Sequence, residues 1–133
     1  MKRGTPSRTR GFTLLELMVV LTIMLLLLSM AIPIYSRSVK KKREEVFLTN
    51  LQTLNKVIYQ YTLDKKKAPK SLEDLVQAKY LKEIPNDITG RNDTWAVDED
   101  ESIMSPEQTE TGVTGVHSGS SETAIDGTQY STW

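Results

Sequence analysis

A single carboxylate lies inside an otherwise apolar stretch near the start of this 133-residue chain. The stretch runs from Phe12 to Ile34, 23 residues, and Glu16 is its one charged side chain. With a rise of about 1.5 Å per residue, a helix of this length crosses the roughly 30 Å apolar core of a bilayer. A carboxylate there costs on the order of 2.5–3.5 kcal/mol on insertion scales. Glu16 therefore needs either a partner of opposite charge or a place near the interface to which it can snorkel.

The residues before the apolar stretch carry positive charge only. Four basic residues precede it and no acidic residue does: Lys2, Arg3, Arg8 and Arg10. A basic leader before an apolar run is typical of a secretory signal, but this run exceeds the usual length of about 7–15 residues. Ser29-Met30-Ala31 is a poor cleavage site, and the small residue lies instead at Gly11, between the basic and apolar segments.

The ten residues from Gly11 to Val20 resemble the signal of class III prepilins, the family of type IV pilins and the pseudopilins of type II secretion. They read Gly-Phe-Thr-Leu-Leu-Glu-Leu-Met-Val-Val at a basic-to-apolar junction. The resemblance implies that prepilin peptidase cuts between Gly11 and Phe12 and methylates the new amino group of Phe12. It also implies that Glu16 pairs with the terminal amine of a neighbouring subunit during assembly. Such a pair is physically sensible, because opposite charges attract strongly at low dielectric and either alone would be costly.

The same resemblance implies the topology. The leader, residues 1–11, would lie in the cytoplasm, and a single helix would anchor the chain in the bacterial inner membrane with its C-terminal domain in the periplasm. Charge alone does not decide this orientation, because five basic residues also follow the apolar stretch: Arg37, Lys40, Lys41, Lys42 and Arg43. This basic cluster is expected to be a solvated face near lipid headgroups, or alternatively to contact acidic groups of the next subunit.

The composition favours a structural protein over an enzyme. The chain has no cysteine and one histidine, His117, which is expected in a strand rather than in a catalytic triad. Loss of the leader leaves 13 of the 17 basic residues against 17 acidic ones, a net charge of −4, so no nucleic-acid partner is expected. A small extracytoplasmic domain without disulfides must be stabilised by something else.

One long helix is expected from about Thr13 to about Leu63. Past the apolar stretch, five residues recur at i, i+4, i+7, i+11 and i+14 on one face: Phe47, Leu51, Leu54, Ile58 and Tyr61. Residues 12–35 would be the transmembrane or filament-core part, 36–63 an amphipathic stem, and 64–133 a small globular domain. Pro33 predicts a kink or a locally opened turn, with a true helix end as the alternative.

The second half predicts short elements. A helix is expected to begin at Ser71 and to end near Leu81-Lys82, and strands are expected at 94–97 and 112–118. The acidic run 98–101 is expected to be a loop. The predicted fold class is therefore α+β and pilin-like: a long N-terminal helix packed on a small C-terminal domain with a short helix and a small antiparallel sheet.

This second half resembles the major pseudopilins of type II secretion. The segments that carry the resemblance are Ser71-Leu72-Glu73-Asp74-Leu75, Ile84-Pro85-Asn86-Asp87, Val116-His117-Ser118-Gly119-Ser120 and Ser131-Thr132-Trp133. The resemblance implies a calcium ion in the C-terminal loop, and by position its ligands would come from Val116, Ser118, Ser120 and Asp126. Calcium takes about six to eight oxygens. Only Glu122 and Asp126 are acidic here, so a loop held by serine and backbone hydrogen bonds is the alternative.

The expected function is that of a major pseudopilin, which polymerises into a periplasmic filament that drives protein secretion. Its implied partners are further copies of the chain, prepilin peptidase, minor pseudopilins, the inner-membrane assembly platform and the lipid bilayer. Two alternatives stay open: a type IV pilus subunit for motility, adhesion or DNA uptake, and a minor pilin that binds substrate.

Overall fold

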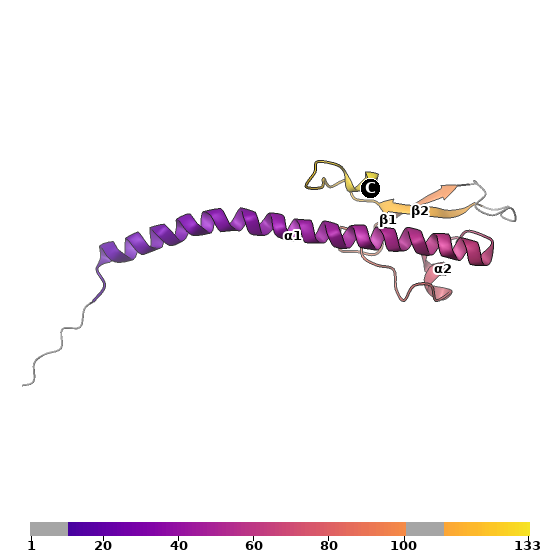
Figure 1. The fold of residues 1–133 in the computed structure, drawn as a ribbon, viewed down its shortest axis with the longest axis horizontal. Coiled ribbons are helices and arrows are strands. Elements are labelled where there is room, and N and C mark those ends of the chain that lie inside the picture. Colours follow the sequence, from indigo (N-terminus) through magenta and orange to yellow (C-terminus); the bar gives the residue numbers. More distant parts are fainter. Residues whose placement is uncertain (1–10, 101–110) are drawn as a thin grey trace, which may run out of the picture. The chain divides into compact units, whose positions relative to one another are not determined.

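The expected α+β architecture is confirmed by a computed structural model, which describes residues 11–100 and 111–133. Its elements are α1 (Leu14–Lys65), α2 (Leu72–Gln77), β1 (Trp95–Asp100), β2 (Gly112–Ser118) and the 3₁₀ helix η1 (Tyr130–Thr132) (Figure 1). The chain divides into two compact units, Met1–Ser38 and Val39–Trp133, and α1 contributes residues to both.

Helix α1 is 52 residues long and contains Pro33. The alternative prediction, that the helix ends at this proline, is therefore wrong. The helix ends two residues later than predicted, where Lys66 takes a left-handed backbone conformation with φ of 59°. Part of α1 is apolar and long enough to cross a membrane.

The core of the second unit forms around one face of α1. All five residues of the predicted stripe are buried, and Leu54 and Ile58 are fully enclosed. They pack against apolar side chains from the remaining elements and the loops between them: Leu72, Leu75, Ile88, Val113, Val116, Ala124 and Tyr130. The periodicity of the stem therefore predicted the surface on which the domain folds.

Helix α2 ends earlier than predicted, at Gln77 rather than near Leu81. Lys79 has a φ of 62°, and the amide of Tyr80 donates back to the carbonyl of Leu75 (2.9 Å). The amide of Lys79 also donates to the carbonyl of Val76 (3.0 Å). These two bonds form a Schellman ending, for which glycine is the usual residue at the left-handed position. Here a lysine occupies that position, so the sequence carried no stop signal.

Strands β1 and β2 form a two-stranded antiparallel sheet in which Trp95 lies opposite Ser118. The predicted bounds of the second strand are confirmed. The prediction that the acidic run is a loop is wrong for Asp98, Glu99 and Asp100, which belong to β1. These three residues are exposed, so burial does not penalise their charges while their backbone pairs with β2. Glu101 lies outside the described residues.

Candidate functional site

Gly11 and Phe12 lie before the start of α1, and both are exposed. A Cβ built on Gly11 would meet nothing within 4 Å, and Gly11 does not have the positive φ seen at Gly90 and Gly127. The chain's own fold therefore gives no reason for a glycine at this position. A requirement for close backbone approach by another molecule, such as a peptidase, would give one.

Thr13 caps the N-terminus of α1. Its Oγ1 accepts a hydrogen bond from the amide of Glu16 (3.2 Å), and its carbonyl accepts one from the amide of Leu17 (3.1 Å). This is the first half of a capping box, in which a glutamate three residues after the cap also reaches back with its side chain. The capping fixes where the helix begins, and it places Glu16 in the first turn.

The Glu16 carboxylate makes no hydrogen bond or ion pair within residues 11–100 and 111–133. The hydroxyl-bearing side chains further along the apolar stretch do have partners. Thr22 Oγ1 donates to the carbonyl of Met18 (2.8 Å), and Ser29 Oγ donates to the carbonyl of Leu26 (2.7 Å). These intrahelical bonds satisfy their hydroxyls inside a membrane. Glu16 is left as the group that needs a partner from outside the described residues.

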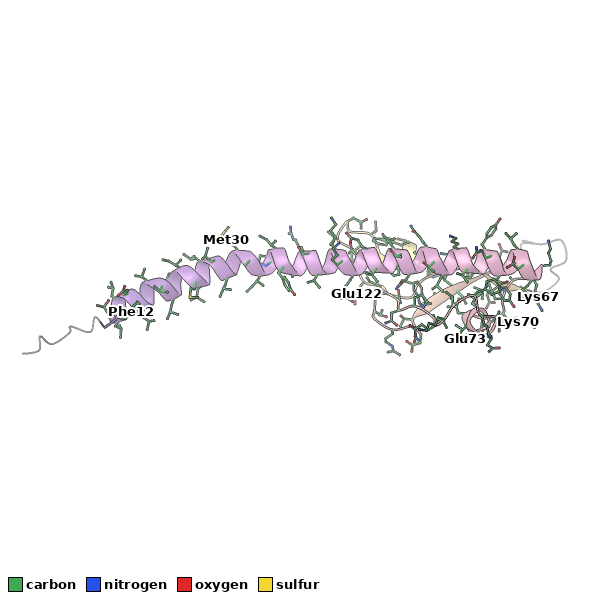
Figure 2. All side chains as sticks on the ribbon, turned by 60° about the horizontal axis from the view of Figure 1, so that its bottom comes forward. Phe12, Met30, Lys67, Lys70, Glu73 and Glu122 are labelled. Atoms are coloured by element: carbon green, nitrogen blue, oxygen red, sulfur yellow. The ribbon has the colours of Figure 1, made fainter. Side chains whose placement is uncertain are left out.

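The large apolar side chains from Phe12 to Ile34 are 44–81% exposed. Figure 2 labels two of them, Phe12 just before the start of α1 and Met30 within it. An exposed apolar surface of this extent is not stable in water, so this part of α1 requires lipid or other protein chains around it.

The four residues predicted to hold calcium lie in and after β2. Val116, Ser118 and Ser120 are buried, and Asp126 is exposed. Asp126 Oδ1 accepts hydrogen bonds from the hydroxyl (2.7 Å) and the amide (2.9 Å) of Thr128, and these bonds lower the pKa of the Asp126 carboxyl. Ser120 Oγ accepts a bond from the amide of Glu122 (3.2 Å).

Ser118 is turned toward a different carboxylate. Asp87 is buried and accepts three bonds: from the amide of Ile88 (2.7 Å), from Thr94 Oγ1 (2.8 Å) and from Ser118 Oγ (2.8 Å). In the sequence analysis, Asp87 was named only as the end of the segment 84–87 and had no predicted role. A turn aspartate is usually exposed, and only the non-local contact with Ser118 shows that this one is not.

Three of the four predicted residues thus have protein hydrogen-bond partners in this arrangement: Ser118, Ser120 and Asp126. Among the described residues, no three Asp, Glu or His side chains gather as a metal site would require. Calcium binding stays a prediction, and serine and backbone hydrogen bonds hold the loop in the structure.

Two members of the basic cluster contact the chain's own domain. Lys40 Nζ donates to the carbonyl of Thr123 (2.7 Å), and Arg43 Nη2 donates to the carbonyl of Ile88 (2.7 Å). Lys42 pairs with Glu45 at 2.6 Å on the exposed side of the helix. Lys40 and Arg43 therefore fasten the C-terminal domain to the stem, a role that the sequence analysis did not predict.

His117 lies in β2, as expected for a strand residue. Its Nδ1 is 3.0 Å from Oδ1 of Asp98 on the neighbouring strand. The sheet thus brings a histidine and a carboxylate together. The hydroxyl of Thr114 donates to the backbone carbonyl of Asp98 (3.1 Å) and not to its carboxylate, so the histidine–carboxylate pair has the geometry of a cross-strand contact.

Comparison with known protein families matches residues 6–32 to the prokaryotic N-terminal methylation motif. The match includes Gly11, Phe12 and Glu16, the residues that the sequence analysis assigned to processing and assembly. Neither the curated proteins nor the solved structures gave a match. The chain thus carries, at the start of a long apolar helix, the class III N-terminal methylation signal of type IV pilin-like proteins.

Proposed function

We propose that this chain is a major pseudopilin, the repeating subunit of a periplasmic filament that drives type II protein secretion. The single observation that carries the proposal is the Glu16 carboxylate, which has no partner among the described residues and lies four positions after Phe12, within the methylation motif. Prepilin peptidase would cut between Gly11 and Phe12 and methylate Phe12.

Assembly would follow from two properties of the first unit. Its exposed apolar side chains keep the subunit in the inner membrane until they can be buried against other subunits in the filament core. The Glu16 carboxylate would meet the amino group of Phe12 of a neighbouring copy. In a low-dielectric core this pair favours one register between subunits, since a carboxylate left without a cation there is costly.

The second unit would face the periplasm. It is one small domain, built on the stem of α1 and lacking cysteine, which suits a repeating subunit better than a large ligand-binding tip. Minor pseudopilins and the inner-membrane assembly platform would be its further partners, and its role would be structural rather than catalytic.

A type IV pilus subunit or a minor pilin is the alternative, because both classes share the motif. Deletion of the gene, followed by complementation with the wild-type chain, separates them. A pseudopilin mutant loses secreted proteins from the medium and keeps its surface pili. Loss of pili or of DNA uptake with normal secretion would contradict the proposal and favour the alternative.

A further inference from the structure

One stripe of the stem holds the C-terminal loop, which we define as residues 119–133. Lys40, Glu44 and Phe47 follow i, i+4, i+7 spacing and so share a face of α1. We call these three residues the stem stripe. Each of them contacts the loop, and the contacts span more than 80 residues of sequence. Figure 1 shows the C-terminal end of the chain beside α1.

Glu44 is the centre of these contacts. Its Oε1 accepts a hydrogen bond from the hydroxyl of Tyr130 (2.7 Å) and another from the amide of Ile125 (2.9 Å). Glu44 is 9% exposed and Tyr130 is 1% exposed. Bonds to a largely buried carboxylate are strong, and leaving either donor without an acceptor would be unfavourable.

Aromatic side chains pack around Phe47, the third residue of the stem stripe. Tyr130 and Trp133 lie with their ring centroids 5.8 and 5.9 Å from that of Phe47, and 5.3 Å from each other. Trp95 of β1 stacks on Phe47 from another side at 5.7 Å. Trp133 also donates from Nε1 to Thr128 Oγ1 (2.6 Å), so the last residues of the chain are fixed to both the stem and the loop.

The loop residues that a calcium ion would use are already engaged with protein groups. Asp126 binds Thr128, Ser120 accepts from Glu122, and the Ser118 hydroxyl binds Asp87. We infer that Glu44, with Lys40 and Phe47, is the staple of the C-terminal loop in this chain, in the place where a disulfide or a bound metal ion would otherwise act. The loop then closes without calcium.

The test uses the full-length chain in detergent, followed by tryptophan fluorescence during heating. The chain has two tryptophans, and both contact Phe47, so the signal reports on the stapled region itself. The wild-type midpoint is expected to be the same in millimolar calcium and in EGTA. A rise of the midpoint on adding calcium would overturn the inference.

The matched variants are Glu44→Ala and Glu45→Ala. Both remove a carboxylate from adjacent positions of one helix and introduce the best helix former. Glu45 lies on the exposed side and pairs with Lys42. Glu44→Ala is expected to lower the midpoint by at least about 4 °C, while Glu45→Ala changes it little. Equal midpoints for the two variants would contradict a staple at Glu44.

Hydrogen exchange gives a local readout that a general loss of stability would not reproduce. The amide of Ile125 donates to Glu44 and should exchange faster in Glu44→Ala than in Glu45→Ala, while amides within β2 keep their wild-type rates. Should Glu44→Ala fail to fold, Tyr130→Phe removes one of the two bonds and keeps the ring. Its midpoint should fall in the same direction, and an unchanged midpoint for Tyr130→Phe would refute the inference.

Discussion

The hydroxyl of Ser118 donates a hydrogen bond of 2.8 Å to Oδ2 of Asp87, 31 residues earlier in the chain. Ser118 is the last residue of β2 and is fully buried, and Asp87 lies in the turn before β1. Because Thr94 Oγ1 donates to the same oxygen, one carboxylate joins the turn, the start of β1 and the end of β2. This polar contact therefore ties the turn to both strands of the sheet.

The Asp87 contact predicts a stability difference between two aspartates. Asp87→Ala removes the acceptor of two hydroxyls and one amide, of which Ser118 is fully buried. The free energy of unfolding should fall by about 1–3 kcal/mol, the cost of buried donors without acceptors. Asp93 is exposed and pairs with Arg91, so Asp93→Ala should stay within about 0.5 kcal/mol of wild type. Denaturant unfolding followed by tryptophan fluorescence measures both, and equal losses would argue against the role of Asp87.

Processing should depend on Gly11 while folding does not. In Gly11→Ala the new Cβ meets nothing within 4 Å, so the chain should insert and fold at wild-type levels. If the peptidase needs the bare backbone at this residue, cleavage should be lost. Intact-mass analysis of membrane-extracted wild-type protein should show loss of residues 1–11 and one added methyl group. A wild-type start at Met1, or at a site beyond Ala31, would contradict the assignment of the signal.

Structural features that depend on residues close together in the sequence could be predicted from it. The burial of Phe47, Leu51 and Leu54 followed from helical spacing, because that pattern depends on the helix alone. The N-terminal methylation motif could also be predicted, because it lies in one short segment that includes Gly11 and Phe12. Periodicity and motif both act over a few residues, so no knowledge of the fold was needed.

Features that depend on distant residues could not be predicted. Asp98 to Asp100 have low strand propensity, and they are in β1 because β2 supplies their hydrogen bonds. Glu44 is one of several polar residues of the stem, and its burial follows from Tyr130, 86 residues later. The contact of Ser118 with Asp87 is equally non-local, so choosing calcium ligands by position could not foresee it, and calcium binding stays a prediction.

Assembly should require the carboxylate of Glu16 but not the other polar groups of the apolar stretch. Glu16→Ala removes no hydrogen bond made by the side chain within the described residues and makes membrane insertion easier. The variant should therefore reach normal membrane levels and be cleaved, yet form no filaments and support no secretion. Thr22→Ala is the matched control, because the Thr22 hydroxyl donates to the carbonyl of Met18 in its own helix. Sheared filaments containing Glu16→Ala protein would show that charge pairing is not needed.

The staple should also show a characteristic dependence on alkaline pH. Burial and the hydrogen bond to Glu44 raise the pKa of Tyr130 from its usual value of 10 to about 12. The folded chain therefore keeps the Tyr130 proton at pH values where the unfolded chain loses it. The resulting stability is fully present below pH 10 and is lost as the pH rises from 10 through about 12.

Other groups titrate in this range, so the measurement is a difference between variants. The free energy of unfolding of wild type minus that of Tyr130→Phe should fall between pH 10 and 12, because phenylalanine has no proton to lose. Tyr59 is 53% exposed, so Tyr59→Phe is the control for loss of a tyrosine hydroxyl elsewhere on the stem. A Tyr130→Phe difference that does not change between pH 10 and 12 would mean that the Tyr130 hydroxyl is not held by Glu44 in the folded chain.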